Sequence, residues 1–124
     1  MLDRLAELVN EDPSIVRLGR FMSCEFVIAV GDASYHVEVR QGRIEAVRSG
    51  PLKMRSHAFA ISAPNDVWDR FWGPLPDPGY QDIFAMTRWG HARIDGDLAP
   101  LLANLRYVKE VLAAPRRLNR RTGQ

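Results

Sequence analysis

The chain has 124 residues, a length typical of one domain. Its hydrophobic fraction of 46% and charged fraction of 26% are ordinary for a globular protein, and no apolar run approaches the ~18 residues of a membrane span. The net charge of +2 comes from four arginines in the last nine residues, because the remainder has thirteen basic against fifteen acidic residues. This distribution predicts no nucleic-acid-binding face, and it limits membrane contact to peripheral contact through the Arg116–Arg121 tail.

The first half of the chain passes from helical to extended periodicity. Apolar residues recur at helical spacing over residues 2–10, and a second helical turn is expected to run from a Ser14 cap to Leu18. Period-two patterns then predict strands at residues 24–30, 35–39, 43–49 and 57–61, separated by glycine-containing turns. In the second of these strands His36 alternates with valines, so it is expected on the polar face.

The second half is predicted to be mostly helical. A helix is expected from Pro64 to residue 72, a short helix over residues 81–89, a brief strand at 91–94, and a long helix from an Asp97 cap to residue 114. Strands in the middle and helices at both ends predict an α+β fold, a sheet covered on one face by helices. We expect one domain over residues 1–115, followed by a basic, disordered tail over residues 116–124.

Aromatic side chains are concentrated in one segment. Six of the eleven lie between residues 68 and 89, where they either fill a core or line a cavity for an apolar ligand. The candidate wall residues occupy the presumed inner faces of strands and helices: Phe26, Ile28, Trp68, Trp72, Phe84, Met86, Trp89, Leu101 and Leu105. If Trp68 is part of a wall, Trp68→Ala should weaken ligand binding more than folding; if it is core, the reverse holds.

No catalytic constellation is visible. The chain has three histidines, at positions His36, His57 and His91, and they lack the spacing of metal ligands. Cys24 has no neighbouring base that could activate its thiol. Because it is the single cysteine, it forms no internal disulfide, which fits a reducing, cytoplasmic location. The charged segment Met1–Arg4 does not resemble a secretory signal, which fits the same location. Asp95-Gly96-Asp97 is best interpreted as a turn followed by a helix cap. The sequence therefore predicts no catalytic residue, no metal and no cofactor.

An isomerase-type enzyme would need a carboxylate held in an apolar pocket. The acids near the aromatic segment all fall at helix starts or on polar faces, which speaks against this class: Asp66, Asp69 and Asp82.

Six pieces follow one another in a characteristic order. They are a hairpin at residues 35–47, a strand at 58–62, helices at 65–71 and 82–86, a strand ending Arg93-Ile-Asp-Gly-Asp, and a helix containing Leu101-Leu-Ala-Asn-Leu. In this order and spacing, over roughly residues 20–113, the chain resembles the sterol carrier protein 2 (sterol-transfer) domain family, of bacterial type. In that family a strand passes through a Gly-Asp-like turn into a helix with a Leu-x-x-Asn/Gln-Leu core.

The resemblance implies helices closing over a curved, mostly antiparallel five-stranded sheet, with an apolar cavity between the two layers. It also implies a hydrophobic small molecule as partner (a lipid, fatty acid or sterol-like compound), bound without a cofactor and without catalysis. The alternative is an accessory interaction module, a homodimer or the partner of a hydrolase, whose aromatic face is buried in a protein interface.

Overall fold

The computed structural model describes residues 2–50, 57–73, 76–80 and 82–118. Its N-terminal helices are η1 (Leu2–Arg4), α1 (Leu5–Asn10) and α2 (Pro13–Leu18). The strands are β1 (Ser23–Val30), β2 (Ala33–Arg40), β3 (Arg43–Ser49), β4 (Phe59–Ala63) and β5 (Arg93–Gly96). The later helices are α3 (Asn65–Phe71), α4 (Ile83–Arg88), α5 (Ala99–Ala103) and α6 (Leu105–Ala113).

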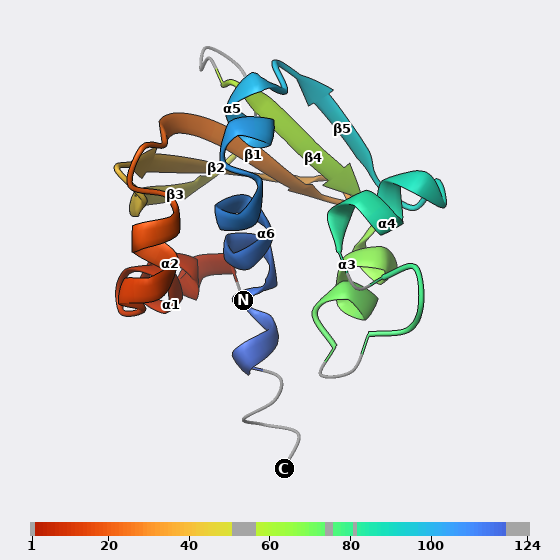
Figure 1. The fold of residues 1–124 in the computed structure, drawn as a ribbon. Coiled ribbons are helices and arrows are strands. Elements are labelled where there is room, and N and C mark those ends of the chain that lie inside the picture. Colours follow the sequence, from red (N-terminus) through yellow and green to blue (C-terminus); the bar gives the residue numbers. More distant parts are fainter. Residues whose placement is uncertain (1, 51–56, 74–75, 81, 119–124) are drawn as a thin grey trace.

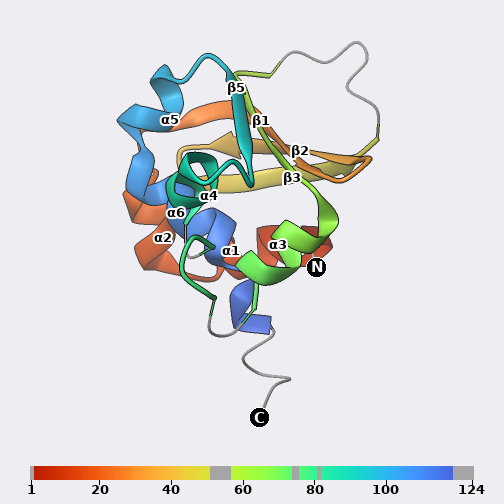
Figure 2. The same cartoon turned by 90° about the vertical axis from the view of Figure 1, so that its right-hand side faces the viewer.

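The five strands form one open, mixed sheet in the order β3-β2-β1-β4-β5. β1 pairs with β4 in parallel, whereas the other three neighbouring pairs are antiparallel. In Figures 1 and 2 the helices lie along one side of the curved sheet, so the predicted α+β class and the mostly antiparallel arrangement are confirmed.

The N-terminal helices cover the β3 edge of the sheet. The Asn10 side chain donates to Ile44 O at 2.9 Å and accepts from Ile44 N at 2.8 Å, so α1 satisfies backbone groups of an edge strand. The predicted cap of α2 was wrong by two residues. Asp12, not Ser14, is the cap, because its carboxylate accepts from the backbone N–H groups of Ser14 and Ile15.

The core lies between the sheet and the helices. On the inner face, the rings of Phe26 in β1 and Phe59 in β4 stack with centroids 5.0 Å apart. Helix α6 closes over them and contributes Tyr107, whose hydroxyl donates to Gly42 O at 2.7 Å. This bond ties α6 to the turn between β2 and β3.

The opposite face of the sheet is not simply polar. His36, expected on a polar face, is only 2% exposed, and its Nδ1 lies 3.5 Å from Oε2 of Glu25. Its register partner Val27 is completely buried as well. Alternation predicts which face a residue occupies, but it does not predict whether other parts of the chain cover that face.

The predicted long helix is two helices. It breaks at Asn104, whose backbone adopts φ −128° and ψ 36° between α5 and α6. The amide side chain of Asn104 donates to Pro100 O at 3.0 Å, which stabilises the break locally. The apolar spacing alone did not reveal this break, and it also placed Leu98 and Leu102 on the buried face, whereas these two side chains are 39% and 58% exposed.

The start of the predicted tail is anchored rather than disordered. Arg116 donates twice to Phe71 O, at 3.0 and 2.6 Å, and its guanidinium lies 4.8 Å from the centroid of the Phe71 ring. Arg117 forms an ion pair with Asp12 at 2.9 Å. The rest of the predicted tail, residues 119–124, lies outside the described residues.

Candidate functional site

Trp68 of α3 and Trp72, the residue just after α3, connect three parts of the fold. Trp68 is fully buried and donates from Nε1 to Ala29 O in β1 at 2.9 Å. Trp72 is almost as deeply buried and donates from Nε1 to Leu112 O in α6 at 2.8 Å. Both indole N–H groups are therefore satisfied, as a stable buried tryptophan requires.

The aromatic rings of α3 pack directly on one another. Trp68 stacks on Trp72 with centroids 5.0 Å apart and meets Phe71 edge-on at 5.6 Å. These separations are those of favourable aromatic pairs in direct contact. At this end of the layer the rings fill the space between sheet and helices.

The remaining predicted wall residues divide by burial. Phe26, Ile28, Met86 and Leu101 are fully buried, whereas two lie at the border of the core, Phe84 and Leu105. The predicted inward position of Trp89 was wrong. The helix ends at Arg88, and the Trp89 side chain is 68% exposed.

Some apolar side chains at the border of the core are incompletely covered, and one of them belongs to α4. Phe84 in α4, Ile94 in β5 and Leu105 at the start of α6 pack against the core but are only partly buried. The Lys109 ammonium lies 5.3 Å from the centroid of the Phe84 ring. The sequence analysis left out Ile94 and Lys109; the alternation of β5 could have indicated Ile94, but nothing in the sequence brings Lys109 to Phe84.

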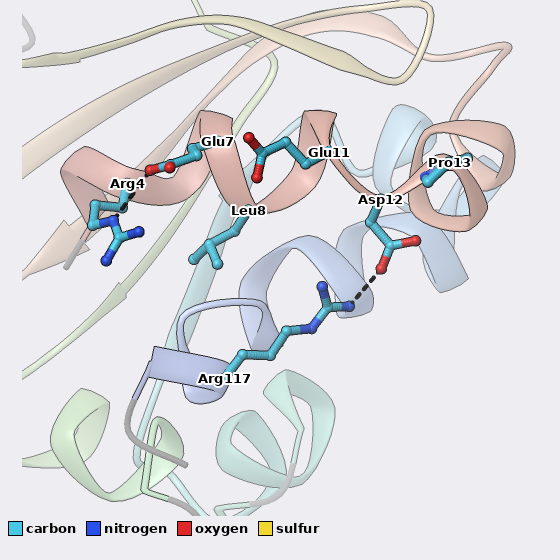
Figure 3. A pocket seen from close by; sticks show the side chains of 7 residues that line it. All are labelled: Arg4, Glu7, Leu8, Glu11, Asp12, Pro13 and Arg117. Atoms are coloured by element: carbon cyan, nitrogen blue, oxygen red, sulfur yellow. Dashed lines mark hydrogen bonds and ion pairs between the residues drawn. The ribbon is translucent and has the colours of Figure 1, made fainter. Parts of the chain in front are cut away.

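Surface pockets formed by described residues include one that borders α4 and others at a distance from it. A polar pocket of about 410 Å³ lies between α1, α2 and the end of the chain, where Arg117 reaches Asp12 and Arg4 pairs with Glu7 (Figure 3). The Ser14 hydroxyl and, to a smaller extent, Arg117 hold the pKa of Asp12 below its usual value. The charged lining of this pocket does not suit an apolar ligand.

Two further pockets flank the aromatic helix. A groove of about 190 Å³ runs over Phe71 and Ile83 and is bordered by Lys109 and Arg116. A shallow hollow of about 450 Å³ lies where β1 and β4 end, between Gly31 and His91. None of the nine predicted wall residues lines these pockets or the polar one.

The described residues hold no group of histidines, cysteines or acids arranged to bind a metal ion. Burial raises the pKa of the Cys24 thiol, which disfavours its nucleophilic form. The carboxylate of Asp82 accepts from the N–H groups of Phe84 and Ala85, as a helix cap does, and Asp66 and Asp69 are exposed. None of these three acids has the apolar environment that an isomerase-type base requires.

Within the described part of the chain, no helix is long and apolar enough to cross a bilayer. Neither a family model nor a curated protein matches the sequence. Solved structures do match the fold. The chain resembles sterol carrier protein 2 with a TM-score of 0.72 and 14% identity, over 90% of both chains.

Two other structures share this arrangement. One is the UbiJ-SCP2 ubiquinone synthesis protein, with a TM-score of 0.60, 12% identity and coverage of 90% of this chain and 84% of that one. The other is the apo form of sterol carrier protein 2 from Yarrowia lipolytica, with a TM-score of 0.58, 11% identity and coverage of 92% and 88%. The order of strands and helices derived above is therefore that of the sterol carrier protein 2 fold.

Proposed function

We propose that this protein binds and transfers a lipid or another hydrophobic small molecule between its sheet and its helices, without catalysing a reaction. The observation that carries the proposal is the fold, which superposes on sterol carrier protein 2 over nine-tenths of both chains. The partly covered apolar side chains at the border of the core support it, because excess apolar surface is stabilised by a ligand or a partner.

The packing suggests which part of the layer receives the ligand. Trp68 and Trp72 are held by hydrogen bonds at the α3 end, so they form the closed end of the site. The mouth lies at Phe84 and Leu105, which are partly buried at the border of the core, and Met86 lies deeper on the same helix as Phe84. The site thus opens between α4 and the start of α6.

An acyl chain suits such a narrow site better than a broad ring system. Each buried methylene contributes about 0.8 kcal/mol, so eight or more give useful affinity once the entropic costs are met. The ligand must enter by displacing side chains at the mouth rather than the tryptophans, because moving an indole would break a buried hydrogen bond.

Native mass spectrometry of the protein purified from its host tests the proposal first. We expect a reproducible co-purifying apolar species that is released by organic extraction and identified as a lipid. If the protein carries none, and if it also fails to bind a fluorescent fatty acid, the carrier function is refuted.

A matched pair of variants tests the position of the site. Leu105→Trp places a large ring at the mouth and should reduce binding of the fluorescent fatty acid at least tenfold. Arg106→Trp places the same ring at an exposed position of the same helix, outside the lining of the groove beside α4, and should leave binding unchanged. Equal binding by both variants would show that the ligand lies elsewhere.

The second candidate function is an accessory interaction module. The observations that favour it are the fold shared with a ubiquinone synthesis protein and the tight filling of the α3 end by tryptophans. In this case the apolar side chains at the border of the core are buried by a second copy or by an enzyme. Light scattering at micromolar concentration distinguishes the homodimer from the carrier, which we expect to be a monomer.

A further inference from the structure

Apolar side chains protrude at one end of the sheet, away from the proposed ligand site. Phe21, in the link between α2 and β1, is 82% exposed, and its ring lies 4.6 Å from the guanidinium carbon of Arg20. Leu98 and Leu102, at the start of and within α5, are 39% and 58% exposed. Single exposed apolar residues are common, whereas several at one place mark an interaction surface, so the position of these three relative to one another matters.

These three residues lie at the same end of the sheet. Ala58, just before β4, donates to Glu25 O near the start of β1 and accepts from Asp97 N just after β5. Only β4 separates β1 from β5, so the two strands are about 10 Å apart. The link to β1 and α5 accordingly lie together at one end of the sheet in Figure 2.

Arginines lie at the same end of the sheet as the exposed apolar residues. The turn between β2 and β3 carries Arg40 and Arg43, and the Gly42 N–H of this turn donates to Met22 O, next to Phe21. Arg106 is exposed at the start of α6. None of these arginines, nor Arg20, forms an ion pair with an acid among the described residues.

Acids also lie at this end. Asp95 forms an ion pair with Arg93 at 3.0 Å, whereas Asp97 accepts from Ala99 N at 3.0 Å and keeps its negative charge. The four arginines outnumber the two exposed acids that form no ion pair among the described residues, Asp97 and Glu45, so the end presents protruding apolar side chains with an excess of positive charge. That combination complements an anionic bilayer, whose headgroups attract arginine and whose acyl boundary accepts phenylalanine and leucine.

We infer that this end of the sheet, defined by Phe21, Leu98 and Leu102 together with the four arginines, is a docking surface for an anionic lipid membrane.

Vesicle sedimentation tests this surface directly. Wild-type protein should bind vesicles of phosphatidylcholine containing about 30% phosphatidylserine, and binding should fall steeply with added salt. The double variant Phe21→Ser, Leu102→Ser should lose roughly tenfold in affinity, and so should Arg40→Gln, Arg43→Gln. Circular dichroism checks that each variant folds.

The matched control is Trp89→Ser. Trp89 is an exposed aromatic residue whose neighbour Gly90 lines the hollow at the opposite end of β1 and β4, so its removal should leave vesicle binding unchanged. If wild type does not bind the anionic vesicles, or if Trp89→Ser loses as much affinity as the Phe21 double variant, the inference is refuted.

Two more readouts separate this surface from its alternatives. A wild-type dimer that the Phe21 double variant converts to a monomer would make the surface a contact between copies and overturn the inference. The same variant should bind a fluorescent fatty acid in solution as wild type does, because the ligand mouth lies at Phe84 and Leu105. Membrane docking can therefore fail or hold independently of ligand binding.

Discussion

Replacing Trp68 by alanine should damage folding far more than ligand binding. The indole is fully buried, contacts Trp72 and Phe71, and donates to Ala29 O at 2.9 Å. Truncating a buried tryptophan costs about 3–5 kcal/mol, and the carbonyl left without its donor adds to that cost. Since a domain has a total stability of about 5–15 kcal/mol, the variant should lose a large share of it.

Urea denaturation followed by circular dichroism measures this loss. Trp68→Ala should unfold at a much lower urea concentration, whereas Trp68→Phe, which keeps a ring but not the N–H donor, should lose about 1–2 kcal/mol. Trp89→Ala removes an exposed indole and should stay within about 0.5 kcal/mol of wild type. A Trp68→Ala midpoint equal to that of wild type, with an unchanged slope, would refute the assignment of Trp68 to the core.

Three further predictions concern the rest of the core. Burial raises the pKa of Tyr107, so the folded state keeps the phenol protonated, whereas the same phenol in the unfolded chain ionises near pH 10. The free energy of unfolding should therefore fall above that pH. Urea titrations at several pH values should show that Tyr107→Phe removes this alkaline loss. Gly42→Ala should lower the free energy of unfolding by about 2 kcal/mol or more in thermal unfolding, because a Cβ there would collide with Val16 O and the backbone φ is +84°. At Gly90, where φ is +78°, a Cβ meets open space, so Gly90→Ala should cost only about 1 kcal/mol. Cys24 should react slowly with a thiol reagent at neutral pH and quickly once the protein is unfolded, because burial raises its pKa.

The strands were predictable because each carries a local signal. Alternation placed Phe26 and Ile28 on one face of β1, and the glycine-containing turn at Gln41-Gly42 set the hairpin that joins β2 to β3. The parallel pairing of β1 with β4 has no such local signal, since it depends on which strand lies beside which after the chain crosses over. The resemblance to a known family, rather than the alternation of residues, predicted the curved, mostly antiparallel five-stranded sheet.

Two of the wrong predictions, those for Trp89 and Arg116, concern residues that contact other segments of the chain. Trp89 matched the helical spacing of α4, but the helix ends at Arg88, Gly90 takes a positive φ, and the indole comes to lie next to Gly79. Arg116 belongs to an arginine-rich stretch that reads as a solvated tail, yet it binds Phe71 O, 45 residues away. Composition cannot indicate such a partner.

The unequal packing of the two ends of the helical layer reconciles a filled aromatic cluster with a carrier function. At the α3 end, Trp68 and Trp72 are locked to β1 and α6, which fixes the distance between sheet and helices. Helix α4 has only six residues, too few to be stable alone, and its partly buried Phe84 contacts solvent. Under the proposed carrier function, a ligand that displaces α4 would disturb no buried indole hydrogen bond, and the two tryptophans would be the rigid support against which α4 moves.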